Sequence, residues 1–130
     1  MQEFISIEEV RRQVLILRRN YRVNVQKNLN GDFQVYVMKN SDVLAHIEVL
    51  FNSDKNHYVV DWVSATGKML GKGKLLYYMA MDEAFPRFLS SGIRTNQKAN
   101  SVWDAIEKLA EKGKIVKSEK GYKLHSKIGE

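Results

Sequence analysis

Four consecutive segments of alternating polar and apolar residues lie between residues 21 and 65, and they constrain the fold more than any other feature of the chain. A period of two is typical of strands that bury one face. Short polar stretches separate the segments, and Asn30-Gly31 is a common hairpin turn. Because short turns join antiparallel neighbours, the sequence predicts a four-stranded meander. Its strands are expected at residues 21–25, 33–37, 43–51 and 57–65.

A helix is expected before this meander. Segment 6–19 starts with Ser6 and has Glu9 three residues later, which is the signature of a capping box, and Ile5 and Val10 stand where a hydrophobic staple would. Apolar residues then recur at helical spacing, with arginines elsewhere on the surface. The sequence therefore predicts an amphipathic helix whose buried stripe is Ile7, Val10, Val14 and Leu17.

The second half of the chain alternates between helices and strands. An apolar segment from Leu75 predicts a helix that is covered on more than one side and that Pro86 ends. A short strand is expected around residues 92–95, then a helix closed by Gly113, then a strand or hairpin over residues 114–124. These elements predict one α/β domain over residues 1–130, with a mixed, mainly antiparallel sheet of about six strands flanked by three helices.

Composition excludes several classes of protein. The 130 residues include no cysteine, which excludes a disulfide scaffold, a thiolate metal site and a cysteine nucleophile, and favours a cytoplasmic setting. No apolar run reaches the length of a membrane helix, and the N-terminus lacks the pattern of a secretory signal, so no membrane partner is expected. The histidines are His46, His57 and His125, which lack the spacing of metal ligands, so no metal site is predicted.

The net charge of +6 is distributed unevenly. The first 65 residues carry eight basic and eight acidic side chains, whereas residues 66–130 carry thirteen basic and seven acidic ones. This excess indicates an anionic partner at the C-terminal half, either nucleic acid or a phosphorylated cofactor. A lysine-rich surface that only keeps the domain in solution explains the charge equally well.

A turn rich in glycine and lysine, residues 66–74, joins the fourth strand to the next helix. The first amides of a helix lack intrahelical partners and carry partial positive charge, and glycine lets a ligand approach the backbone. With Lys68, Lys72 and Lys74 the turn has the chemistry of a phosphate cradle. The alternative is a loop that needs glycine only for its dihedral angles. The spacing fits neither a P-loop, which fails at Lys72, nor a Rossmann fingerprint, which fails at Leu76.

Residues Lys68-Met69-Leu70-Gly71-Lys72-Gly73 resemble the acyl-CoA signature of the GNAT superfamily of N-acetyltransferases, Gln/Arg-x-x-Gly-x-Gly/Ala, with lysine in the first place. As in that family, the signature lies between a fourth strand and a long helix. A second stretch, residues 96–103, is similar to the family's Asn-x-x-Ala-x-x-x-Tyr, with Trp103 in the place of tyrosine. The resemblance covers about residues 33–125 in topology, and its divergence suits a phage-type or otherwise atypical member of the family.

The resemblance implies acetyl-CoA as the cofactor and acyl transfer to an amine as the reaction. Strand four would separate from strand five and bind the pantetheine arm through the backbone of Val63, Ser64 and Ala65. The cofactor's pyrophosphate would lie on amides of the turn. The resemblance implies nine further cofactor-binding residues. They are Lys68, Met69, Leu70, Gly71, Lys72, Gly73, Lys74, Asn96 and Trp103.

Such a reaction needs a base for the amine and benefits from a proton donor. Glu48 and Asp61 each lie between apolar residues of a strand, where a carboxylate is costly to bury unless it is paired or functional, so they are the candidate bases; either could equally point to solvent. Trp103 cannot donate a proton to a thiolate. The possible substitute donors are Tyr77, Tyr78 and Tyr122, although packing is the better explanation for these tyrosines.

Two other functions stay open at this stage. Residues 101–124 could form the helix and wing of a winged-helix nucleic-acid-binding module, since lysines dominate their C-terminal part. A GNAT-like protein without catalysis could instead serve as an interaction module. The sequence identifies neither the amine acceptor, a small molecule or a protein, nor whether the chain is a monomer or a homodimer.

Overall fold

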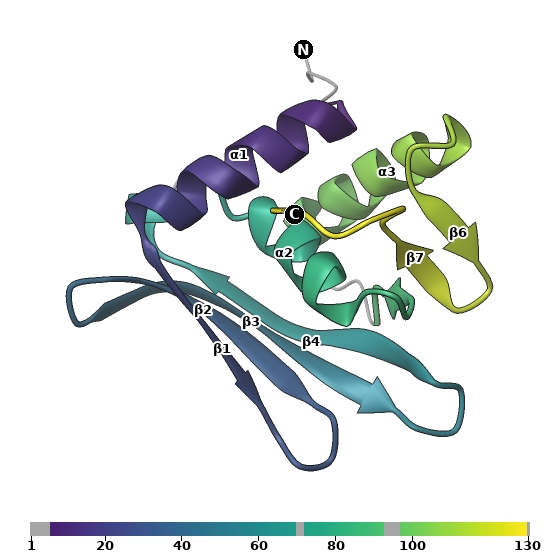
Figure 1. Cartoon of the computed structure of the whole chain (residues 1–130), viewed down its shortest axis with the longest axis horizontal. Helices are drawn as coiled ribbons and strands as arrows, with labels where there is room; N and C mark the ends of the chain where they lie inside the picture. Colours follow the sequence, from purple (N-terminus) through teal and green to yellow (C-terminus); the bar gives the residue numbers. More distant parts are fainter. Residues whose placement is uncertain (1–5, 70–71, 93–96, 130) are drawn as a thin grey trace.

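The computed structural model describes residues 6–69, 72–92 and 97–129, and Figure 1 shows the arrangement of their helices and strands. The described residues form three α-helices, one short 3-10 helix and seven strands. In chain order the elements are α1 (Ile7–Asn20), β1 (Arg22–Lys27), β2 (Phe33–Lys39), β3 (Asp42–Asn52), β4 (His57–Ala65), η1 (Gly67–Met69), α2 (Leu75–Ala84), β5 (Leu89–Ser90), α3 (Gln97–Glu111), β6 (Val116–Ser118) and β7 (Gly121–Lys123).

All seven strands belong to one mixed sheet, in the order β1-β2-β3-β4-β5-β7-β6. The predicted meander is confirmed, because β1 to β4 pair successively and antiparallel. Only β4 and β5 pair in parallel, and α2 provides the crossover between them. The sheet has one strand more than the approximate prediction, since residues 114–124 form a hairpin, β6 and β7, in place of a single strand.

The first helix forms as its sequence pattern predicts. The Ser6 hydroxyl accepts a hydrogen bond from the Glu9 amide at 3.1 Å, and the predicted apolar stripe is buried. In a complete capping box the Glu9 carboxylate would also accept a hydrogen bond from the Ser6 amide. Here this carboxylate binds Arg12 and Gln13 instead. The predicted staple residue Ile5 lies outside the described residues.

The second helix occupies the centre of the molecule (Figure 1). Nine of its ten residues are buried, which agrees with the prediction of a helix covered on several sides. It ends at Ala84, directly before the Phe85–Pro86 peptide, as the proline predicts.

The prediction of a strand around residues 92–95 is tested only at Gly92, which does not lie in a strand. The strand lies earlier, at Leu89–Ser90, and Gly92 has a positive φ of 64°, which is not a strand conformation. Residues 93–95 lie outside the described residues. The end of α3 is predicted correctly, since Gly113 has a φ of 76° and the Lys114 amide binds the Leu109 carbonyl at 2.9 Å.

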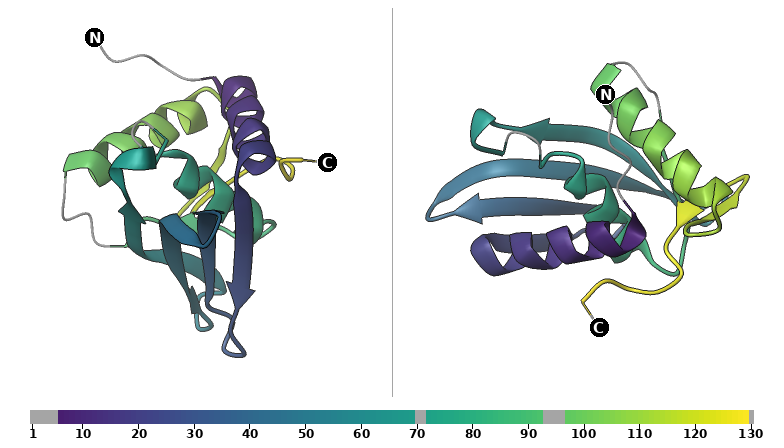
Figure 2. Two further views of the ribbon diagram at one scale, coloured as in Figure 1. Left: turned by 90° about the vertical axis from the view of Figure 1, so that its left-hand side faces the viewer. Right: turned by 90° about the horizontal axis from the view of Figure 1, so that it is seen from above.

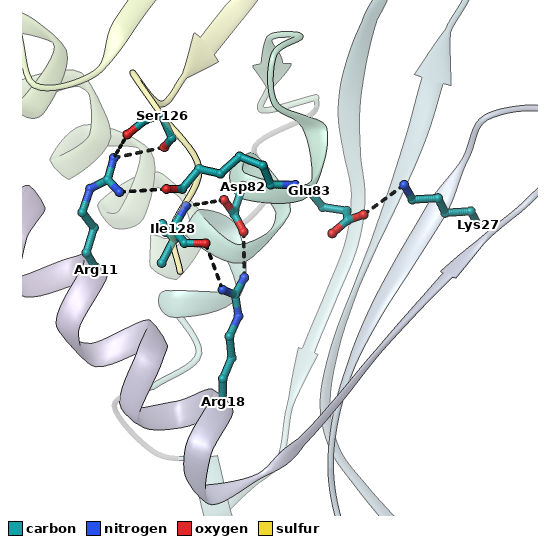
Figure 3. A network of polar contacts seen from close by, with 8 residues as sticks. Arg11, Arg18, Lys27, Asp82, Glu83, Ser126 and Ile128 are labelled. Atoms are coloured by element: carbon teal, nitrogen blue, oxygen red, sulfur yellow. Dashed lines mark hydrogen bonds and ion pairs between the residues drawn. The ribbon is translucent and has the colours of Figure 1, made fainter. Parts of the chain in front are cut away.

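The C-terminal tail is held against the helices by a polar network (Figure 3). Asp82 of α2 is 3% exposed; it accepts hydrogen bonds from the Arg18 guanidinium at 2.7 Å and from the Ile128 amide at 2.6 Å. Arg11 binds the carbonyls of Ser126 and Lys127 at 3.0 and 3.1 Å. The network therefore joins α1, α2 and the tail.

The helices leave one face of the meander uncovered. Figures 1 and 2 show α1, α2 and α3 on the same side of β1 to β4. The strand residues on that side form the core with the helices, as the alternating burial of β2 shows. The opposite side, here called the open face, is covered by no helix or strand within residues 6–69, 72–92 and 97–129.

Candidate functional site

Strands β4 and β5 are neighbours in the sheet, and they separate halfway along β4. Only Tyr58 and Val59 of β4 pair with β5, so residues 61–65 have no strand neighbour on that side in the described part of the chain. A β-bulge lies at the same level, since Val49 pairs with Val60 and Glu48 with Trp62, which leaves Asp61 as the extra residue. A bulge bends its strand and increases its twist, which gives a physical reason for the separation.

Gly92, two residues after β5, lies where the two strands begin to separate. A Cβ atom at Gly92 would lie 2.6 Å from the Val60 carbonyl oxygen and 3.0 Å from Cγ1 of Val59. The chain after β5 thus contacts β4 at Val60, and the unpaired part of β4 begins with the next residue.

The turn between β4 and α2 begins with the short helix η1. The Met69 amide donates to the Thr66 carbonyl and the Lys72 amide to the Met69 carbonyl, both at 2.9 Å. These two amides are therefore used within the turn, contrary to the expectation that they face a ligand. The α2 N-cap, Lys74, makes no side-chain cap hydrogen bond.

Two glycines of this turn, Gly67 and Gly73, are not required by the backbone. Neither Gly67 nor Gly73 has a φ in the left-handed region, unlike Gly92 and Gly113. A Cβ at Gly73 would make only an ordinary contact of 3.5 Å, with Cβ of Ala65, and one at Gly67 would meet nothing within 4 Å. A need for glycine dihedral angles therefore does not explain either glycine. Gly73 lies beside the end of the unpaired β4 segment.

The other predicted cofactor residues differ in accessibility. Lys68 and Lys72 are exposed, Lys74 and Gly73 are half-buried, and Met69 is buried in the core. In β4, Val63 and Ser64 are half-buried and Ala65 is exposed. Leu70, Gly71 and Asn96 lie outside the described residues.

Both candidate bases lie at the middle of the sheet. Asp61 is exposed at the bulge of β4. Glu48 of β3 lies on the open face and its side chain is 38% exposed. Its Oε2 atom is 3.1 Å from Nε2 of His46, so a neighbouring side chain holds this carboxylate in place.

Trp103 is 1% exposed and belongs to the core. Its indole packs edge-on against Tyr77 at 5.6 Å between ring centroids and lies 5.8 Å from the ring of Tyr122. Burial raises the pKa of Tyr77, and it raises the pKa of Tyr78 to about 12. Both tyrosines are therefore weaker acids than an exposed tyrosine, which makes them poor proton donors.

The lysine-rich C-terminal hairpin is part of the sheet. Leu89 of β5 pairs with Tyr122 of β7, so the hairpin is not a separate wing. Lys117 binds Glu107 at 2.8 Å, a hydrogen bond that raises the pKa of Lys117, and Lys123 lies over the Phe88 ring. Two of the lysines that suggested a nucleic-acid interface are thus already engaged within the domain.

Three residues beside Glu48 were not singled out as a site from the sequence. His46 and Glu48 are two residues apart in a strand, so they share a face, and this signal was available. Tyr36 and Trp62 join them only through the strand register, because Tyr36 pairs with His46 and Trp62 with Glu48. The bulge at Asp61 sets the second pairing.

Comparisons with known proteins identify no relative. No family model, curated protein or solved structure matches this chain. Within the described residues, no helix has both the length and the apolar character needed to cross a membrane.

Proposed function

We propose that this chain is an atypical GNAT-like domain that binds acetyl-CoA and transfers its acetyl group to an amine. The observation that carries the proposal is the turn before α2. It places a glycine that neither dihedral angles nor packing requires, Gly73, at the start of a helix and beside the unpaired segment of β4. A backbone without side chains at a helix N-terminus suits a phosphate group.

The residues present fit the cofactor. The amides of Gly73 and Lys74, at the start of α2, would hold its diphosphate, while Lys68 and Lys72 add positive charge near it. Residues 63–65 pair with no strand on the β5 side within the described part of the chain, and their backbone groups would bind its pantetheine arm. Bound there, acetyl-CoA would supply an activated thioester.

The acidic residues of the central strands supply the proton transfer. Glu48 is the better candidate base, because His46 fixes its carboxylate on the open face, and Asp61 at the bulge is the alternative. Each carboxylate can take a proton from an ammonium group, directly or through water. The buried tyrosines hold their protons, so the chain offers no strong donor there.

Calorimetric titration with acetyl-CoA and with desulfo-CoA tests the binding step. We expect saturable heat from both, and a loss of affinity of about 100-fold or more in Gly73→Asp, through steric overlap and repulsion of the diphosphate. Ser53→Asp, which adds the same charge in the exposed turn between β3 and β4, is the matched control and should bind as the native chain does. Native affinity in Gly73→Asp, or no heat from the native chain, would refute the proposal.

Two further measurements separate the alternatives. Titration with duplex DNA at two salt concentrations tests nucleic-acid binding, and salt-dependent affinity without CoA binding would favour that function. Release of free thiol from acetyl-CoA with a panel of amines tests catalysis. Binding of CoA without thiol release from any amine would favour an interaction module without catalysis.

A further inference from the structure

Four side chains from three neighbouring strands meet on the open face. They are Tyr36 of β2, His46 and Glu48 of β3 and Trp62 of β4, here called the open-face cluster. Tyr36 pairs with His46 in one row of the sheet, and Glu48 pairs with Trp62 in the next row. Side chains in such positions are direct neighbours on one surface.

Three members of the cluster hold one another in place. The rings of Tyr36 and His46 are stacked, with centroids 5.5 Å apart and an angle of 16° between their planes. His46 Nε2 lies 3.1 Å from Oε2 of Glu48. Within the described residues the other oxygen, Oε1, makes no hydrogen bond, and the Glu48 side chain is 38% exposed. The cluster thus presents a positioned carboxylate with one oxygen available.

Trp62 supplies an aromatic surface beside that carboxylate. It is 60% exposed, although it stands in an inner strand of the sheet. An indole face attracts cations and also packs against alkyl chains. An available carboxylate oxygen next to such a ring suits a cation that has an apolar stem.

The charged residues of β3 and β4 favour a cation as well. Strands β3 and β4 contain no lysine or arginine, although the chain has a net charge of +6. Their charged residues are Asp42, Glu48 and Asp61, and all are acidic. Asp61 immediately precedes Trp62 and is exposed, which adds a second negative charge near the cluster.

We propose that the open-face cluster binds a primary alkylammonium group of the lysine side-chain type. The alkyl stem lies on the indole of Trp62 and the ammonium donates to Oε1 of Glu48. The inference rests on the proposed function in one respect, since it names the acceptor as an aliphatic amine with an apolar stem. Binding itself requires no cofactor and is measurable on the chain alone.

The test uses N-acetyl-lysine amide as the probe and N-acetyl-norleucine amide as its neutral analogue. Binding is followed by tryptophan fluorescence, which reports on the cluster because Trp62 is exposed and Trp103 is 1% exposed. We expect saturation in roughly the millimolar range with the lysine compound, and at least about tenfold weaker binding of the neutral one. Equal binding of the two compounds, or no saturation with either, would overturn the inference.

Two variants locate the binding. Glu48→Gln keeps the shape of the side chain and removes its charge, and it should weaken binding of the lysine compound about fivefold or more. Asp54→Asn, in the exposed turn between β3 and β4, removes the same charge elsewhere and should leave binding unchanged. Equal affinities in Glu48→Gln and the native chain would place the ammonium elsewhere and overturn the inference.

The result can be separated from that of the proposed function. A chain that binds desulfo-CoA but not the lysine compound keeps the proposed function and loses this inference. A chain that binds the lysine compound but neither CoA species keeps the open-face site and loses the acetyltransferase proposal.

Discussion

Gly92 is the residue that lets the chain after β5 approach the backbone of β4 closely. Its φ of 64° is unfavourable for a residue with a Cβ, and a Cβ there would lie 2.6 Å from the Val60 carbonyl oxygen. We expect Gly92→Ala to lower the free energy of unfolding by at least about 2 kcal/mol, through backbone strain and steric overlap together. Urea unfolding followed by circular dichroism measures the change.

Gly67→Ala is the matched control for this substitution. Gly67 lacks a left-handed φ and a Cβ there would meet nothing within 4 Å. We therefore expect a change of less than about 1 kcal/mol, in the stabilising direction, because alanine restricts the unfolded chain. Equal losses in the two variants would contradict the specific role of Gly92.

At the scale of residues, the sequence identified the acidic positions but not their surroundings. Glu48 and Asp61 stand out because a carboxylate interrupts an apolar strand. That His46 holds Glu48, and that Trp62 lies beside it, depends on the register and on a bulge, neither of which local pattern determines. In the turn, the use of the Met69 and Lys72 amides depends on a 3-10 conformation that composition does not reveal.

At the scale of elements, Asp82 joins two helices and the C-terminal tail (Figure 3). Its removal leaves the Arg18 guanidinium without its carboxylate and the Ile128 amide without its acceptor. Because the Asp82 side chain is only 4% exposed, we expect Asp82→Ala to lower the free energy of unfolding by about 3 kcal/mol. Urea unfolding of the purified variant measures this loss.

The neighbouring residue on the same helix provides the control. Glu83 binds Lys27 at 3.1 Å, and the Lys27 side chain is 67% exposed. Such a solvent-exposed ion pair contributes little, so Glu83→Ala should cost about 1 kcal/mol or less. If Glu83→Ala lowers the free energy of unfolding as much as Asp82→Ala does, the buried network contributes no more than an exposed ion pair, which contradicts this prediction.

The elements that the sequence predicts well are those with a strong period of their own. Helix α1 and strands β2 to β4 carry clear patterns, and each forms within two residues of its predicted bounds. Strand β5 is only two residues long and exists because β4 and β7 lie on either side of it, so no local pattern marks it. Likewise, the pattern of residues 114–124 is compatible with either a single strand or a hairpin. In the structure a hairpin forms, and its strand β7 pairs with β5.

At the scale of the whole molecule, helix α2 connects the proposed site with the core. Its N-terminus forms the proposed phosphate cradle, while the rest of the helix is buried between the sheet and the other helices (Figures 1 and 2). Its position therefore couples the geometry of the turn to the stability of the entire domain.

Burial of α2 also predicts how this stability changes with pH. The pKa of Tyr78 is raised from 10.0 to about 12 by burial, so above pH 10 the unfolded chain loses this proton while the folded chain retains it. The stabilisation that Tyr78 contributes is thus complete below pH 10 and is lost as the pH rises toward 12, by up to about 2–3 kcal/mol. Between pH 8 and pH 11, the midpoint of urea unfolding should decrease less in Tyr78→Phe than in the native chain. The same decrease in both proteins would contradict a buried, neutral Tyr78 and would place the alkaline sensitivity elsewhere in the fold.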